Sequence, residues 1–112
     1  VGNVKDCDVI MIDDMTATCG TLCAAAKILR EHGAASIRAA VTHIPLSDKG
    51  VERLETDHGM EELIVTDTIP LRPDLADRNL GIPVRLLSGA DLFGEAISRI
   101  HENQTVSNLF NH

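Results

Sequence analysis

The feature that most constrains the fold is an apolar run that ends in two carboxylates. Residues 7–12, CDVIMI, are short and rich in branched aliphatic side chains, as buried strands are, and Asp13 and Asp14 follow them. A stretch of small and polar residues, 15–20, separates these acids from an amphipathic helical pattern over 21–33. This order predicts a strand, a loop and a helix.

The rest of the sequence repeats this alternation of apolar runs and helical patterns. Further strands are expected at 36–43, 61–67 and 82–88. A helix is expected at 51–59, and another is expected to open at Ser88-x-x-Asp91, whose spacing resembles a capping box. Strands that alternate with helices imply a parallel sheet with right-handed crossovers. We therefore expect an α/β fold with flanking helices, in a single domain of 112 residues.

Charge and composition exclude several classes of partner and site. The formal net charge of -7 argues against nucleic acid or an anionic membrane as a partner. No apolar run approaches the ~20 residues that a membrane span needs, and the histidines show no metal-ligand spacing, so no metal site is expected. Cys7, Cys19 and Cys23 are interpreted as free thiols, which predicts a cytoplasmic location. Because the sequence begins at Val1, we expect it to be processed, proteolysed or excerpted from something longer.

The loop before the first helix has the residue types of a phosphate-binding turn. The first-turn amides of a helix that starts near Thr21 lack intrahelical partners, and the positive end of the helix dipole lies behind them. Ala17, Cys19 and Gly20 are small enough to let an anion approach the backbone, and Thr18 and Thr21 can add hydroxyl hydrogen bonds. Ligands bind at the carboxyl ends of parallel strands, where this loop is expected.

The two carboxylates beside this loop suggest which anion it binds. Asp13 and Asp14 repel a polyphosphate but accept hydrogen bonds from vicinal diols, and a phosphate at one end with hydroxyls at the other describes a sugar phosphate. An ordinary strand-loop-helix turn with acids that cap the helix explains the same residues, because helix N-termini attract Asp and Thr in any case. Both interpretations stay open on the residues alone.

Four segments in order resemble one enzyme family. Residues 9–22, VIMIDDMTATCGTL, look like the ribose 5-phosphate-binding motif of type I phosphoribosyltransferases, and of ribose-phosphate pyrophosphokinases above all. Residues 42–54, 62–71 and 87–112 resemble later segments of the pyrophosphokinases. The resemblance implies a type I phosphoribosyltransferase-like fold, with residues 1–112 as the C-terminal portion of the second domain of such an enzyme.

The resemblance implies an activity in nucleotide biosynthesis. The family makes 5-phosphoribosyl 1-diphosphate and AMP from ATP and ribose 5-phosphate with Mg²⁺, and its members are homo-oligomers. Carried over, Asp13 and Asp14 engage the ribose hydroxyls. The residues that hold the 5-phosphate are Thr18, Cys19, Gly20 and Thr21. The family's ATP and metal sites lie outside this sequence, so no catalytic residue is assigned to it and the piece alone is expected to be inactive.

One departure in the loop keeps a second interpretation open. The family has an Asp where this chain has Ala17, which favours a noncatalytic regulatory relative of the synthetase. A salvage phosphoribosyltransferase is a third alternative, which segments 42–54 and 87–112 disfavour.

The end of the sequence also resembles the family. Thr105, Ser107 and Phe110 match a tail that helps to form an inhibitory nucleotide or phosphate site between subunits. The alternative is an ordinary apolar tail that docks on the core.

Overall fold

The sheet has the parallel arrangement that the sequence predicts. The computed structural model describes residues 2–56, 58–75 and 80–110. Within them, four parallel strands lie in the order β1-β2-β3-β4. Their bounds are β1 Asp8–Met15, β2 Ser36–His43, β3 Glu62–Thr66 and β4 Val84–Leu87. All four lie at or near the predicted positions, but β1 continues through both carboxylates to Met15, because its backbone stays paired with β2 as far as His43.

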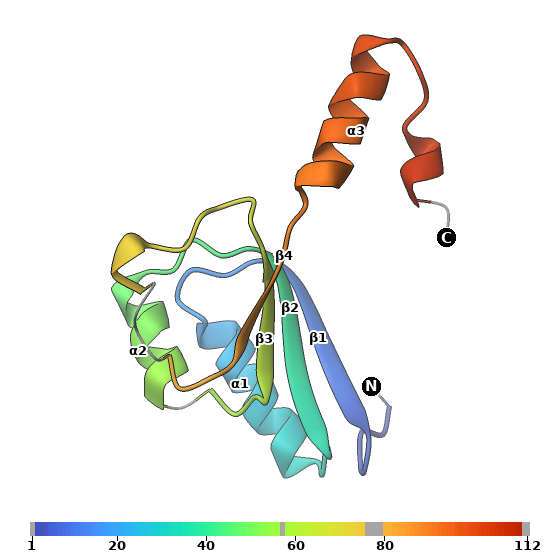
Figure 1. Cartoon of the computed structure of the whole chain (residues 1–112). Helices are drawn as coiled ribbons and strands as arrows, with labels where there is room; N and C mark the ends of the chain where they lie inside the picture. The colour runs from blue at the N-terminus through green and yellow to red at the C-terminus, as the bar shows by residue number, and fades with distance from the viewer. Residues whose placement is uncertain (1, 57, 76–79, 111–112) are drawn as a thin grey trace.

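Two helices cover one face of this sheet. The helix α1 (Gly20–Glu31) links β1 to β2, and α2 (Asp48–Thr56) links β2 to β3. Where the strand order of a parallel sheet never reverses, as within the described strands, crossovers of the usual right hand place both helices on the same side. Figure 1 shows them together on one side of the sheet. A short 3-10 turn, η1 (Pro73–Leu75), lies between β3 and β4.

The hydrophobic core lies between the sheet and these two helices. Along β2, alternate residues point toward the helices and are buried, as the period of two in a strand requires. The core residues from these elements are Ile37, Ala39, Val41, Leu63, Val65, Leu22, Cys23, Ala26, Val51 and Leu54. These mostly aliphatic side chains fill a single layer between the sheet and the two helices.

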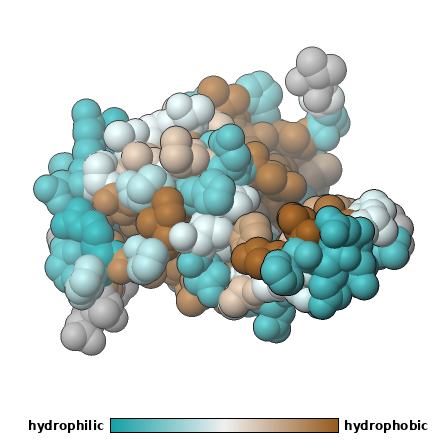
Figure 2. Space-filling model, turned by 90° about the horizontal axis from the view of Figure 1, so that it is seen from above, coloured by the Kyte–Doolittle hydropathy of each residue, from teal (hydrophilic) through white to brown (hydrophobic). Residues whose placement is uncertain are grey.

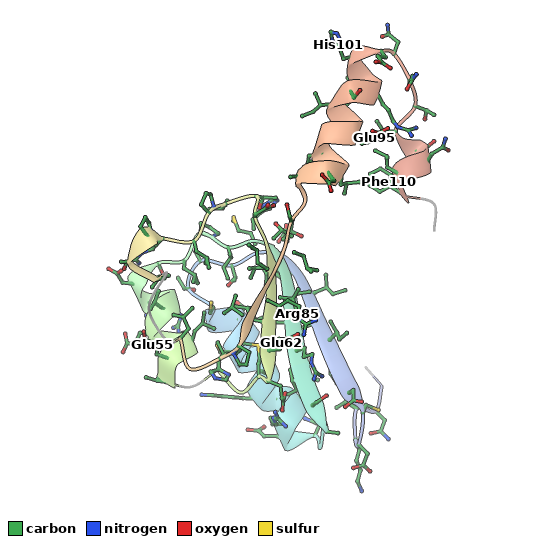
Figure 3. The ribbon with its side chains drawn as sticks, in the orientation of Figure 1. Glu55, Glu62, Arg85, Glu95, His101 and Phe110 are labelled. Carbon is green, nitrogen blue, oxygen red and sulfur yellow. The ribbon has the colours of Figure 1, made fainter. Side chains whose placement is uncertain are left out.

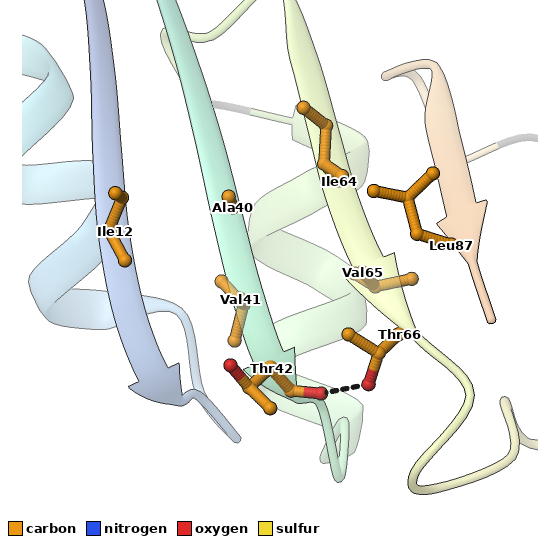
Figure 4. A pocket seen from close by; sticks show the side chains of 8 residues that line it. All are labelled: Ile12, Ala40, Val41, Thr42, Ile64, Val65, Thr66 and Leu87. Atoms are coloured by element: carbon orange, nitrogen blue, oxygen red, sulfur yellow. Dashed lines mark hydrogen bonds between the residues drawn. The ribbon is translucent and has the colours of Figure 1, made fainter. Parts of the chain in front are cut away.

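The opposite face of the sheet is apolar and exposed. Ile10 and Ile12 of β1 are 61% and 83% exposed. A shallow pocket on the sheet is lined by Ile12, Ala40, Val41, Thr42, Ile64, Val65, Thr66 and Leu87 (Figure 4). Figure 2 shows, from above, apolar residues at the surface beside hydrophilic ones. The predicted flanking helices are therefore confirmed, but α1 and α2 flank one face only.

The last helix projects away from the sheet. In Figure 1, α3 (Ala90–His101) rises beyond the end of β4 and is followed by the short turn η2 (Ser107–Phe110). The apolar side chains along this helix are exposed, with Ile97 68% and Ile100 65% accessible. Within the described residues, no helix is both long and apolar enough to cross a membrane.

The tail folds back on α3 and not on the core. Arg99 forms an ion pair with Glu95 at 2.8 Å and donates a hydrogen bond to the carbonyl oxygen of Thr105 at 3.3 Å. Phe110 is 66% exposed, and Figure 3 places it beside α3, near Glu95 and far from the sheet. The alternative of a tail that docks on the core is therefore wrong for this structure.

The start of α3 is capped from the end of β3. Gly89 is the N-cap residue and offers no side-chain cap, so the predicted capping box of Ser88 and Asp91 is wrong. Instead, the Asp67 carboxylate accepts hydrogen bonds from Ser88 Oγ at 2.5 Å and from the Gly89 amide at 2.9 Å. These two bonds, that from Ser88 foremost, hold the pKa of Asp67 below its usual value.

The Asp67 cap predicts a pH effect at the junction between the sheet and α3. Because the pKa of Asp67 is lowered in the folded state, its stabilising contribution is complete above the ordinary Asp pKa and is lost as the pH falls through the folded pKa. We expect the Gly89 amide resonance to titrate with this lowered pKa. The titration should disappear in Asp67→Asn, and a Gly89 resonance that titrates unchanged in that variant would contradict the cap.

Candidate functional site

The two predicted sugar-binding carboxylates lie at the carboxyl end of the edge strand β1. Asp13 is half-buried and pairs with Val41 of β2, whereas Asp14 is exposed. Successive side chains alternate between the faces of a strand, so Asp13 lies on the helix-covered face and Asp14 on the bare face. The Asp14 amide donates a hydrogen bond to Asp13 Oδ1 at 2.8 Å, which fixes the orientation of that carboxylate.

The loop between β1 and α1 is folded on its own hydroxyl groups. The amide of Thr16 donates to the His43 carbonyl at 3.1 Å, which ties the start of the loop to β2. Cys19, the N-cap residue of α1, is left-handed with φ 58, a conformation that costs a residue with a Cβ about 1–2 kcal/mol. Its amide donates to Thr16 Oγ1 at 3.2 Å, and the Gly20 amide points to Thr18 Oγ1 at 3.4 Å. The loop is thus a tight, internally bonded turn.

Several donors of this turn are available to a ligand. The amides of Ala17 and Thr18 make no hydrogen bond within the part of the chain that the structure describes. Gly20 and Thr21 open α1, where first-turn amides have no intrahelical carbonyl to pair with. Thr18 and Thr21 are exposed, so their hydroxyls can contact solvent. Amides, hydroxyls and the helix dipole together suit an anion.

Cys19 contributes to the turn through its backbone and not its thiol. Its side chain is fully buried, and this burial raises the pKa of the thiol. The Thr16 hydrogen bond and the nearby Arg53 charge act in the opposite direction but are smaller effects. The residue therefore fills space beneath the loop as a small apolar group.

The beginning of α2 lies directly behind the loop, an arrangement that the sequence prediction missed. The helix was expected from residue 51, with Gly50 in the preceding loop, but α2 begins at Asp48 and contains Gly50. Ser47 donates from its amide at 3.0 Å and from its hydroxyl at 3.1 Å to the carbonyl oxygen of Ala17. Arg53 Nη1 donates to the carbonyl oxygen of Thr18 at 2.8 Å. Pro45 and Gly50 gave a loop signal for residues 44–50, and no local pattern indicates contact with a loop about thirty positions earlier.

A second set of hydroxyls links the carboxyl ends of β2 and β3. Thr66 Oγ1 and Thr68 Oγ1 both donate to the carbonyl oxygen of Thr42, at 2.5 and 3.0 Å, and the first of these bonds is drawn in Figure 4. His43 Nδ1 lies 2.7 Å from Thr68 Oγ1. His43 is therefore a hydrogen-bonded residue at a strand end, which holds the neighbouring loops together.

Not all of the predicted site residues come together. The carboxylates and the loop, 13–21, lie at the carboxyl end of β1. Thr105, Ser107 and Phe110 lie on the projecting segment, where Thr105 Oγ1 and Ser107 Oγ are 2.9 Å apart. No group of three or more His, Cys, Asp or Glu side chains that could hold a metal ion occurs among the described residues.

Comparisons with known proteins find one family. A model of the phosphoribosyl synthetase-associated domain matches residues 1–111. The chain is 42% identical over 110 residues to a ribose-phosphate pyrophosphokinase of Campylobacter jejuni, a match that covers 98% of this chain and 33% of that protein. It is 44% identical over 110 residues to a ribose-phosphate pyrophosphokinase of Gloeobacter violaceus, with 98% of this chain and 32% of that protein covered.

A solved structure has a similar fold. The phosphoribosylpyrophosphate synthetase of Mycobacterium smegmatis superposes with a TM-score of 0.79 at 40% identity, over 92% of this chain and 33% of that chain. The sequence therefore spans about one third of the length of these relatives. The comparisons do not support the prediction that it is the C-terminal part of its parent.

The burial of Cys19 predicts a difference in thiol reactivity. Cys7 is exposed, whereas Cys19 and Cys23 are buried, so a thiol-alkylating reagent should modify Cys7 first. Because burial raises the pKa of Cys19, less of its reactive thiolate is present at neutral pH. We expect at least about tenfold slower alkylation of Cys19 than of Cys7, measured by mass spectrometry of peptides. Equal rates in the folded protein would mean that the loop opens readily.

Proposed function

This chain belongs to the phosphoribosyl synthetase-associated domain family, and we propose that its segment 13–21 binds ribose 5-phosphate for a ribose-phosphate pyrophosphokinase. The observation that carries the proposal is a turn with available amides at the start of α1, directly after two carboxylates at the end of β1. The relatives' names suggest the reaction class. The geometry of the turn supports an assignment of each end of the substrate to particular residues.

The phosphate end of the substrate is assigned to the turn. The amides of Ala17, Thr18, Gly20 and Thr21, with the hydroxyls of the two threonines, act as donors to the phosphate oxygens. In this assignment the weak bond of 3.4 Å between the Gly20 amide and Thr18 Oγ1 is exchanged for a bond to phosphate. Cys19 supplies the left-handed conformation that turns the chain into α1, and its thiol stays buried.

The sugar end is assigned to the carboxylates. Ionised Asp13 and Asp14 can accept hydrogen bonds but cannot donate them. They therefore suit ribose hydroxyls and repel phosphate. Asp13 is on the face that carries α1, and the Asp14 amide already orients its carboxylate. Because Asp14 points to the other face, the ribose would lie beyond the end of β1, where both carboxylates can reach it.

For the whole protein we propose the synthetase reaction. The C1 hydroxyl oxygen of ribose 5-phosphate attacks the β-phosphorus of ATP, the bond from that phosphorus to the AMP oxygen breaks, and the C1 hydroxyl proton leaves to a base. Binding and orientation of both substrates supply much of the rate in such transfers. The resemblance to the family implies Mg²⁺ as a cofactor of the whole protein, held by segments outside this sequence. A cytoplasmic location and a homo-oligomeric state remain predictions.

A noncatalytic relative is a second candidate, and Ala17 favours it. The side chain of Ala17 is half-buried and its carbonyl is held by Ser47, so the turn is well formed without the family's Asp at this position. A protein of this kind keeps the fold, loses substrate contacts and makes no 5-phosphoribosyl 1-diphosphate. Formation of AMP by the full-length protein from ATP, ribose 5-phosphate and Mg²⁺ distinguishes the two candidates.

The assignment of the two ends predicts unequal losses in carboxylate variants. Asp13→Ala or Asp14→Ala should weaken binding of ribose 5-phosphate to the full-length protein by about 1.5–3 kcal/mol, the worth of a hydrogen bond to a charged group. Binding of inorganic phosphate should change little, since it makes no contact with the carboxylates. Calorimetric titration of both ligands measures the difference, and equal losses would contradict the assignment.

The isolated chain should have no synthetase activity. The sequence spans about one third of the relatives' length, and we assign it the binding of one substrate only, so ATP has no site beside the sugar. The assay is AMP formation by the purified chain, free of host synthetase. Turnover that scales with the amount of chain and disappears in Asp13→Ala would show that this piece carries more of the chemistry than we propose.

A further inference from the structure

The back of the proposed phosphate-binding turn is held by the residue before α2 and by the second turn of α2. Two consecutive carbonyl groups of the turn, those of Ala17 and Thr18, accept hydrogen bonds from Ser47 and Arg53 respectively. Ser47 supplies two donors to the Ala17 oxygen, and its hydroxyl oxygen at the same time accepts a bond from the Gly50 amide at 3.2 Å. A carbonyl oxygen that is bonded to α2 faces α2, so the negative ends of these peptide dipoles point away from the side of the turn that is open to solvent.

Close approach of the helix makes these contacts possible, and Gly50 permits the approach. A Cβ atom at position 50 would lie 2.2 Å from the carbonyl oxygen of Ala17 and 3.2 Å from its carbonyl carbon. Such an overlap cannot be relieved by turning a side chain, because the atom that it meets belongs to the backbone of the turn. Gly50 is therefore required by packing against the turn and not by its own backbone conformation.

Arg53 brings a positive charge to the same place. Its Nη1 is 2.8 Å from the Thr18 carbonyl oxygen and 3.0 Å from the point that a Cβ atom on Gly20 would occupy. Across the described ranges, no carboxylate forms an ion pair with Arg53. The guanidinium thus lies against the first residue of α1 without an ion-pair partner among those residues, and its charge offsets part of the rise in the pKa of the Cys19 thiol that burial causes.

We propose that Ser47, Gly50 and Arg53 form a clamp on the back of the turn, and that Arg53 is a positioning residue which makes the turn selective for an anion. The clamp turns the carbonyls of Ala17 and Thr18 toward α2, which leaves amides on the side open to a ligand. The Arg53 charge then adds to the helix dipole of α1 and favours a dianionic phosphate over a neutral sugar. This inference rests on the proposed binding of ribose 5-phosphate by the same turn.

A purely structural role for Arg53 predicts a different result. If the residue only stabilised the fold, its replacement would lower thermal stability and weaken every ligand alike. If its charge acts on the anion, its replacement selectively weakens the binding of ligands whose phosphate occupies the turn, and it also reduces the dependence of that binding on salt.

The test compares variants of the full-length protein in calorimetric titrations with ribose 5-phosphate, inorganic phosphate and ATP. Arg53→Gln should weaken binding of ribose 5-phosphate and of inorganic phosphate by about tenfold or more, the lower range for loss of a charge-assisted hydrogen bond. ATP affinity should change less than about twofold, because ATP has no contact with this turn in our assignment. Arg53→Lys keeps the charge and should recover part of the loss. Between low and high salt, ribose 5-phosphate affinity should fall more steeply in the wild type than in Arg53→Gln.

Two further variants complete the comparison. Arg85→Gln is a matched control, because Arg85 lies on β4, is exposed and pairs with Glu62 at 3.2 Å (Figure 3). It removes the same charge from a place remote from the turn and should leave all three affinities unchanged. Gly50→Ala should weaken the binding of ribose 5-phosphate by at least as much as Arg53→Gln does. If this variant does not fold, the Arg53 variants alone test the proposal.

The outcomes separate the clamp from the function on which it rests. If the wild type binds ribose 5-phosphate and Arg53→Gln binds it as tightly as Arg85→Gln does, the clamp is wrong and the proposed function stands. The selective role is also overturned if Arg53→Gln weakens the binding of ATP and of ribose 5-phosphate equally, or if it leaves the salt dependence of ribose 5-phosphate binding unchanged. If the wild type binds neither ribose 5-phosphate nor phosphate, the proposed function fails and the clamp fails with it.

Discussion

The direction in which the strands advance determines most of this structure. Each described strand adds to the same side of the preceding one, and right-handed crossovers then force α1 and α2 onto one face. Only because both helices share a face can the start of α2 reach the loop before α1 and bind its carbonyls. If the strand order reversed after β2, the crossover would carry α2 to the other face, and the turn would have no helix behind it. The geometry of the candidate site is thus a consequence of topology as much as of its own residues.

Much of this fold is visible in the sequence because its strands are buried and apolar. The alternation along β2 and the short run of β3 produce strong patterns, and the structure confirms strands at these positions. The sequence pattern gave the wrong boundary where the end of an element is determined by contact with residues far away in the sequence. The strand β1 was expected to stop at its first carboxylate, but pairing with β2 continues to Met15. Likewise, Gly50 was expected in the loop before the helix, whereas it lies within α2 and its missing side chain lets α2 contact the turn.

The residues of the loop itself could be singled out from the sequence, but the residues that pack behind the loop could not. The carboxylates, small residues and threonines of 13–21 are contiguous in sequence, so their residue types favour the hypothesis of an anion site beside carboxylates that accept hydrogen bonds from hydroxyl groups. Ser47, Arg53 and Asp67 act on residues from 21 to 35 positions away, and no periodicity or spacing rule connects such pairs. The capping of α3 is an example of this limit: a local serine suggested a local cap, but a carboxylate at the end of another strand supplies the acceptor.

The exposed face and edge of β1 affect how this polypeptide behaves in solution. Within the described residues β1 is paired only with β2, so one row of its backbone groups has no strand partner, and Ile12 above it is 83% exposed. An unpaired edge beside an exposed aliphatic surface is a template for addition of another chain. Separated from a covering partner, the domain will therefore tend to aggregate at high concentration, and the net charge of -7 is the main force that opposes this by mutual repulsion. Its colloidal stability should consequently fall as the pH approaches the isoelectric point near 5.0 or as salt screens the charge.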